Sequence, residues 1–153
     1  MLADRFRIDG NLTPCELDGS DPGEPGRYDY ADIQEAHALA HVPLWLIDAS
    51  QVKLIFDYGF GGHSTFCLGL LMLERDPFRF VEGSVYGDLL PSIAKGLGVG
   101  ADKFRIEAML ALLGHAEALL PDPAHDPTRF KAQRQIVDSA RAAVNLVLAA
   151  ESD

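Results

Sequence analysis

Basic residues are scarce in this chain, and long apolar runs are missing. Lysine and arginine total 13 against 23 aspartates and glutamates, which gives a net charge of −10. An acidic surface repels phosphate backbones and anionic lipids, so the composition argues against nucleic-acid binding and membrane-surface binding. The longest uncharged stretch, 58–73, is too short and too polar to span a bilayer. A basic protein partner, or simple solubility, is left to explain the acidity.

Cysteine is nearly absent as well, with only Cys15 and Cys67 in the chain. Charge at Asp4 and Arg5 stands where the apolar segment of a secretory signal would begin. Without such a signal, two cysteines are expected to be free thiols rather than a disulfide. We therefore expect a cytoplasmic protein.

What the chain does have is enough apolar material for one core, since 48% of its 153 residues are hydrophobic. Residues 1–28 are rich in turn-forming Gly, Pro and Asp, and we expect them to form an irregular arm. Helix signals dominate 29–153, which we expect to be a single helical domain. The predicted fold is mainly α, a compact domain of five or six helices, with an α+β fold of two or three short strands as the alternative.

The first predicted helix begins with Asp29 as its N-cap and runs to Ala40 or His41, before Pro43. Apolar residues at helical spacing predict a second helix after Pro43. The alternative for this segment is a strand at 52–58. The members of this apolar stripe are Trp45, Ala49, Val52 and Phe56.

In the middle of the chain, Ser64 is the expected N-cap of the run 66–73, which is apolar on every side and therefore central. Asp76 and Pro77 predict another helix start. The alternative there is a strand at 78–81 and a helix from about Val85, which Gly96 and Gly98 would end.

Two long helices are predicted at the end of the chain, at 102–120 and at about 127–150, each with Asp as its N-cap. Arg134, Asp138 and Arg141 are expected to pair on the outer face of the second. The expected buried set of the first is Phe104, Met109, Leu112, Leu113, Ala116 and Leu120. That of the second is Phe130, Ile136, Val137, Ala140, Val144, Val147 and Leu148.

His37 and His41 form the most specific local pattern, because an i, i+4 spacing on a helix places two imidazoles on one face. Such a pair can hold zinc, iron or copper when further ligands come from elsewhere. The glutamate-bearing H-E-x-x-H motif is absent, and two half-exposed histidines without a metal are the simpler interpretation. Candidate further ligands are Asp32, Glu35, Asp57, His63, His115 and Glu117.

Three weaker patterns lie nearby. The glycine-rich segment 59–65 would suit an anion at a helix N-terminus, or a turn that brings two elements together. Cys67 follows His63 by four residues, which fits either an activated thiol or a buried structural cysteine. Six aromatic side chains in the middle third would line a ligand pocket or fill the core: Phe60, Phe66, Phe78, Phe80, Tyr86 and Phe104. Separately, Tyr28 and Tyr30 would anchor a partner or the arm itself.

With no complete catalytic motif, the expected function is a small acidic cytoplasmic protein-binding module without catalytic activity. Immunity proteins, antitoxins and secretion chaperones are often of this kind, because an acidic face steers association with a basic partner. The alternatives are a metal-binding helical domain or metalloenzyme that uses His37 and His41, and a small-ligand-binding domain. No cofactor is predicted under the first interpretation, and zinc or iron under the second.

Overall fold

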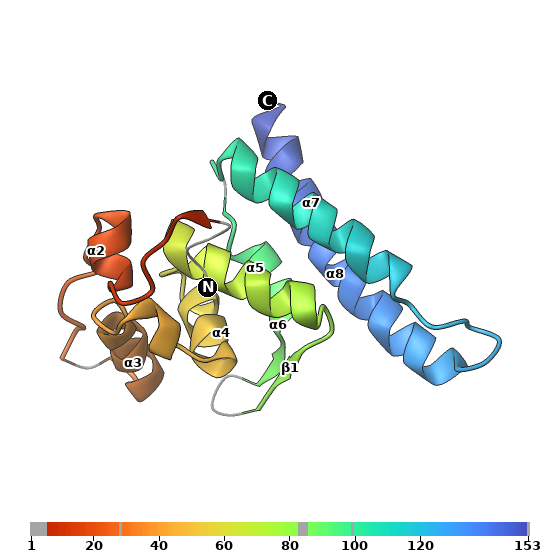
Figure 1. Cartoon of the computed structure of the whole chain (residues 1–153), viewed down its shortest axis with the longest axis horizontal. Coiled ribbons are helices and arrows are strands. Elements are labelled where there is room, and N and C mark those ends of the chain that lie inside the picture. The colour runs from red at the N-terminus through yellow and green to blue at the C-terminus, as the bar shows by residue number, and fades with distance from the viewer. Residues whose placement is uncertain (1–5, 28, 83–85, 99, 153) are drawn as a thin grey trace.

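A computed structural model describes residues 6–27, 29–82, 86–98 and 100–152 (Figure 1). Short helices α2 to α6 form one part, and α7 and α8 lie side by side as a long helical hairpin. The helices are α2 (Pro14–Asp18), α3 (Ala31–Leu39), η1 (Leu44–Leu46, a 3-10 helix), α4 (Ala49–Asp57), α5 (His63–Arg75), α6 (Leu89–Lys95), α7 (Lys103–Ala118) and α8 (Pro127–Glu151). Strands β1 (Phe80–Val81) and β2 (Gly87–Asp88) pair antiparallel.

The prediction of a mainly α fold is confirmed. Six of the described α-helices follow residue 29, as expected, and the seventh, α2, lies within the N-terminal arm. None of the helices in the described part of the chain is both long and apolar enough to cross a membrane.

The helix α4 covers Ala49–Asp57, so the strand alternative for 52–58 is wrong. Asp48 caps α4, because its side chain accepts a hydrogen bond from the Gln51 N–H (2.8 Å) while the Gln51 side chain accepts one from the Asp48 N–H. Trp45 is not on this helix as the stripe predicted. It belongs to η1, where it is exposed.

Two predicted N-caps are corrected. The N-cap of α3 is Tyr30 and not Asp29. The Asp29 carboxylate instead accepts a hydrogen bond from the Gly26 N–H (2.5 Å). Ser64 does not cap α5, because the helix already begins at His63 after Gly62. The apolar run 66–73 nevertheless lies at the centre of the fold, as predicted.

The helix predicted from Asp76 is wrong, and the strand alternative holds in a shorter form as β1. The Asp76 carboxylate accepts from the Phe78 N–H (3.1 Å) in a turn instead of capping a helix. The predicted helix start at Val85 lies outside the described residues. α6 begins at Leu89 and ends before Gly96, where the glycine signal predicted a stop.

The two C-terminal helices are confirmed, each capped by its predicted aspartate. Several details differ. Phe104 is 42% exposed, and four other residues of the expected buried sets are only partly buried: Leu120, Phe130, Ile136 and Leu148. Arg141 pairs with Glu117 of α7 instead of Asp138, so it joins the two helices, while Arg134 and Asp138 pair as expected (3.1 Å).

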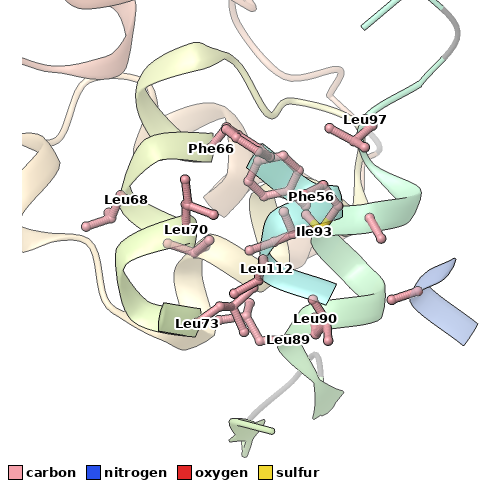
Figure 2. Packing of buried hydrophobic residues seen from close by; sticks show 14 of the residues in the cluster. Phe56, Phe66, Leu68, Leu70, Leu73, Leu89, Leu90, Ile93, Leu97 and Leu112 are labelled. Atoms are coloured by element: carbon pink, nitrogen blue, oxygen red, sulfur yellow. The ribbon is translucent and has the colours of Figure 1, made fainter. Parts of the chain in front are cut away.

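One buried apolar cluster runs from Ile8 in the arm to Val147 in α8. Figure 2 shows its centre, where side chains of α5 and α6 meet around Phe56 of α4 and Leu112 of α7. The arm takes part in this core, since Ile8 is 6% exposed and α2 packs on α5. The boundary at residue 28 stays a prediction.

Candidate functional site

A cavity of about 350 Å³ lies between the arm and helices α3, α4 and α5. We call it the arm cavity. The arm contributes Pro14, Cys15, Asp18 and Asp21, the glycine-rich segment contributes Phe60, Gly61 and Gly62, and the helices contribute Ala36, Ile55 and Thr65. Segments that lie far apart in the sequence thus meet at one place.

The structure separates the two histidines of the sequence motif. α3 ends at Leu39, and the His41 N–H bonds to the Ala38 carbonyl in a tight turn, so His41 lies beyond the helix. His37 Nδ1 lies 2.9 Å from the Gly23 carbonyl oxygen, and its ring packs on Phe60 with centroids 4.6 Å apart.

His41 instead meets two residues of the arm. Its Nε2 lies 3.4 Å from Asp21 Oδ1. The ligating atoms of Cys15, Asp21 and His41 all lie within 4.8 Å of one another. Desolvation, with the negative charges of Asp21 and Glu16, raises the pKa of the Cys15 thiol.

None of the six further ligands proposed from the sequence belongs to this group, within the described residues. Asp57 pairs with Lys53 and Glu117 with Arg141, while Asp32 accepts a hydrogen bond from the Tyr58 hydroxyl (3.5 Å). No local sequence pattern pointed to Cys15 and Asp21, because their nearness to His41 depends on how the arm folds back.

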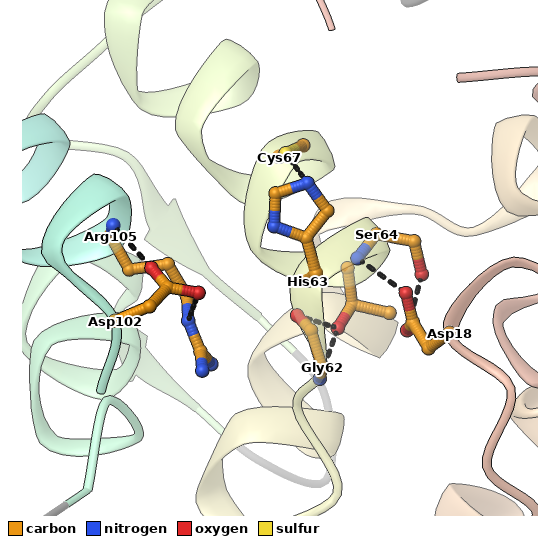
Figure 3. A network of polar contacts seen from close by, with 8 residues as sticks. Asp18, Gly62, His63, Ser64, Cys67, Asp102 and Arg105 are labelled. Atoms are coloured by element: carbon orange, nitrogen blue, oxygen red, sulfur yellow. Dashed lines mark hydrogen bonds and ion pairs between the residues drawn. The ribbon is translucent and has the colours of Figure 1, made fainter. Parts of the chain in front are cut away.

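The N-terminus of α5 already binds an anion, which is the carboxylate of Asp18 (Figure 3). Asp18 accepts hydrogen bonds from the Ser64 N–H (3.0 Å) and the Ser64 hydroxyl (2.7 Å). A Cβ on Gly62 would lie 2.5 Å from Asp18 Oδ2, and one on Gly61 would lie 2.3 Å from the Phe56 ring. The glycines therefore allow close packing here.

His63 and Cys67 come together as the i, i+4 spacing predicted, with Nε2 and Sγ 3.7 Å apart. Cys67 is fully buried, while the His63 ring packs against Phe104 at 5.5 Å. Burial withholds the thiol from solvent, which fits a structural cysteine better than a nucleophile.

The aromatic residues do not line one pocket. Phe66 is buried, Phe60 borders the arm cavity, and Phe80 and Tyr86 form an exposed edge-to-face pair, 5.3 Å apart. Tyr30 is 80% exposed, and Tyr28 lies outside the described residues.

A second hollow, of about 650 Å³, lies between α4, α6, α8 and β2 and was not predicted. Lys53 is only 7% exposed there, and its Nζ bonds to Asp57 (2.5 Å). Asp88 lies in the same hollow, and desolvation raises the pKa of its carboxyl group. The positive charge of Lys53 lowers that pKa by a smaller amount. No sequence pattern marked this buried lysine.

An apolar patch lies where the arm meets η1, and we call Leu12, Trp45 and Leu46 the Trp45 patch. The Leu44 N–H bonds to the Leu12 carbonyl (2.9 Å) and the Trp45 N–H to the Gly10 carbonyl (3.1 Å). The three side chains are 39%, 60% and 53% exposed. These two bonds hold an exposed tryptophan on a defined backbone.

Comparison of the chain with protein families, with curated proteins and with solved structures gives no match.

Proposed function

We propose that the protein is a small acidic protein-binding module, without catalytic activity, that docks a basic partner through the Trp45 patch. The observation that carries this proposal is the exposure of Trp45, the chain's single tryptophan, on a backbone tied to the arm. Tryptophan is among the residues that contribute most to binding when a partner covers them.

The charge around the patch supports a basic partner. Exposed Asp9 and Asp48 flank it in the two segments, and residues 1–75 carry 12 of the chain's acids but only five of its bases. A rim of acidic groups around an apolar centre speeds association with a positively charged surface and selects against acidic ones. Nucleic acids and anionic membranes are therefore not the proposed partners.

Immunity proteins, antitoxins and secretion chaperones are the types of protein that this arrangement suits. A cytoplasmic location fits the proposal, because free Cys15 and Cys67 are compatible with a reducing compartment.

The test is affinity capture from the source cells with the wild type, Trp45→Ala and a matched control, Leu146→Ala. Leu146 lies on α8 and is 74% exposed, so its loss also removes a large exposed apolar side chain. We expect Trp45→Ala to reduce the captured basic protein by at least about tenfold, as for an interface hot spot. Higher salt should weaken capture by the wild type.

Equal capture by wild type and Trp45→Ala would refute the proposal, as would a partner that is acidic. Titration with a purified partner that lacks tryptophan, followed by the fluorescence of Trp45, gives the affinity directly, because Trp45 is the chain's single tryptophan.

A further inference from the structure

We propose that Cys15, Asp21 and His41 form a site for one zinc ion, with the fourth coordination position open to water or a small ligand. This inference is independent of the Trp45 patch, since none of its three residues belongs to that patch. It also differs from the histidine pair of the sequence, because His37 is not a ligand.

The donor set suits zinc. A thiolate, an imidazole and a carboxylate are its usual protein ligands, whereas calcium and magnesium take oxygen ligands. Three protein ligands with an open fourth position are typical of zinc sites that bind an exchangeable molecule. As the zinc–sulfur bond forms, the thiol proton of Cys15 passes to solvent.

The distances fit a tetrahedral ion. Zinc bonds of about 2.0–2.1 Å to nitrogen and oxygen place two such ligands about 3.3 Å apart. His41 Nε2 and Asp21 Oδ1 are 3.4 Å apart before any ion is added. A sulfur ligand needs about 3.6 Å to each of the others. The three ligand atoms all lie within 4.8 Å of one another. Side-chain rotation therefore has to bring the sulfur closer to the other two atoms by at most about 1.2 Å.

The backbone holds the three residues near one another. The Cys15 N–H donates to the Ala40 carbonyl at 3.0 Å, which joins α2 to the turn that carries His41. Gly19 ends α2 in the left-handed conformation (φ 67°), and its N–H bonds to the Cys15 carbonyl. This turn, which favours glycine, returns the chain so that Asp21 reaches Cys15.

The surroundings favour a cation with room beside it. Asp21 and Glu16 both place negative charge at the Cys15 thiol. Cys15 and Asp21 also line the arm cavity of about 350 Å³, which offers space for a ligand at the open position. A fully closed structural site would not leave this space.

The experiment titrates the chelator-treated full chain with Co²⁺, a spectroscopic substitute for Zn²⁺, and then displaces it with Zn²⁺. We expect one equivalent per chain, a sulfur-to-cobalt charge-transfer absorption, and a rise in melting temperature with Zn²⁺. Cys15→Ser should abolish the charge-transfer band. Asp21→Asn and His41→Gln should each weaken affinity by at least about tenfold.

Matched controls separate this site from others in the chain. His125→Gln removes the histidine of another His–Asp pair (His125 Nε2 to Asp122 Oδ2, 3.7 Å), and Cys67→Ser removes the other thiol. His37→Gln tests the histidine pair of the sequence. All three controls should bind Co²⁺ as the wild type does, with circular dichroism confirming that each variant is folded.

Absence of binding at micromolar Co²⁺ and Zn²⁺ would overturn the proposal. Metal binding that persists in Cys15→Ser and in His41→Gln would also overturn it. The same holds if His37→Gln abolishes metal binding while Cys15→Ser retains it.

Discussion

The arm with helices α2 to α5 and the α7–α8 hairpin are held together in different ways. In the hairpin, two long helices form a seam of buried apolar side chains that also contacts α5 and α6, and Arg141 and Glu117 make an ion pair between the two helices. In the first region, short helices surround a cavity, and side-chain hydrogen bonds, such as the two that Ser64 donates to Asp18, join distant segments. The charge differs too, since residues 1–75 have a large acid excess while 123–153 carry four acids and four bases.

This difference implies that the hairpin contributes mainly to stability and that the first region carries the groups available for binding. Side chains buried in a close-packed seam contribute stability but are withheld from ligands, whereas the polar groups of the first region lie at a cavity and at the surface. We therefore expect substitutions in the hairpin to change mainly stability, and substitutions at the Trp45 patch or at Cys15, Asp21 and His41 to change mainly binding.

The largest effect of a single substitution is expected at Leu113, which is fully buried in α7. Leu113→Ala should lower the free energy of unfolding by about 2–5 kcal/mol, as for other leucines that leave a cavity. Leu146→Ala, at a position 74% exposed, should change it by less than about 0.5 kcal/mol. Denaturant unfolding measures both, and similar values would show that the seam is not where stability is concentrated.

Deletion of residues 1–26 tests the other side of the comparison. We expect the helical signal and a cooperative melt to remain, with a loss of about 2–4 kcal/mol from the burial of Ile8 and the bonds of Asp18. The entropy regained by the arm offsets part of that loss. Circular dichroism during heating would contradict this account if the truncated chain were unfolded at all temperatures.

A smaller effect is expected from Asp18→Ala, which leaves the buried Ser64 hydroxyl without its partner. An unsatisfied buried group costs about 1–3 kcal/mol. Asp122→Ala is the matched control, because the Asp122 carboxylate accepts a local bond from the Ala124 N–H. Equal melting temperatures for the two variants would mean that the arm is not anchored through Asp18.

The smallest effect is expected at Asp88, whose pKa is raised above its ordinary value of 3.8, chiefly by desolvation. A raised pKa in the folded state means that stability falls as pH increases from 3.8 through the folded pKa. Asp88→Asn should therefore raise the melting temperature slightly at pH 7, and the gain should vanish below about pH 3.8.

Asp57→Asn serves as the control for that measurement, because it removes the carboxylate that pairs with the buried Lys53. It should lower the melting temperature at pH 7. A fall of the same size in Asp88→Asn would show that Asp88, too, stabilises Lys53 more than its own desolvation costs.

The contrast also explains what the sequence predicted well. Asp102 and Asp126 cap their helices because each side chain accepts a hydrogen bond from the backbone N–H three positions ahead, so a local pattern was sufficient to find these two helix starts. The centres of the predicted buried faces were also found, because their residues recur at helical spacing. They are Met109, Leu112, Leu113 and Ala116 in α7, and Val137, Ala140, Val144 and Val147 in α8.

In the first region the decisive contacts are distant in sequence. Asp18 and Ser64 are 46 residues apart, and no local pattern links them. An i, i+4 spacing places His37 and His41 on one face only if both residues lie on the same helix, and α3 ends before His41. Trp45 fitted a helical stripe by its spacing, but a 3-10 helix tied to the arm turned it outward.

Photo-crosslinking tests docking at the Trp45 patch most directly, with a benzophenone amino acid placed at position 46, next to Trp45, and at position 146 for comparison, because both positions carry an exposed leucine. We expect position 46 to crosslink to a basic protein when intact source cells are irradiated, and we expect the product to be lost when the cells are lysed in high salt before irradiation. No such product is expected from position 146, although Leu146 (74%) is more exposed than Leu46 (53%). The same product from both positions, or none from position 46, would contradict the claim that the Trp45 patch is a docking surface.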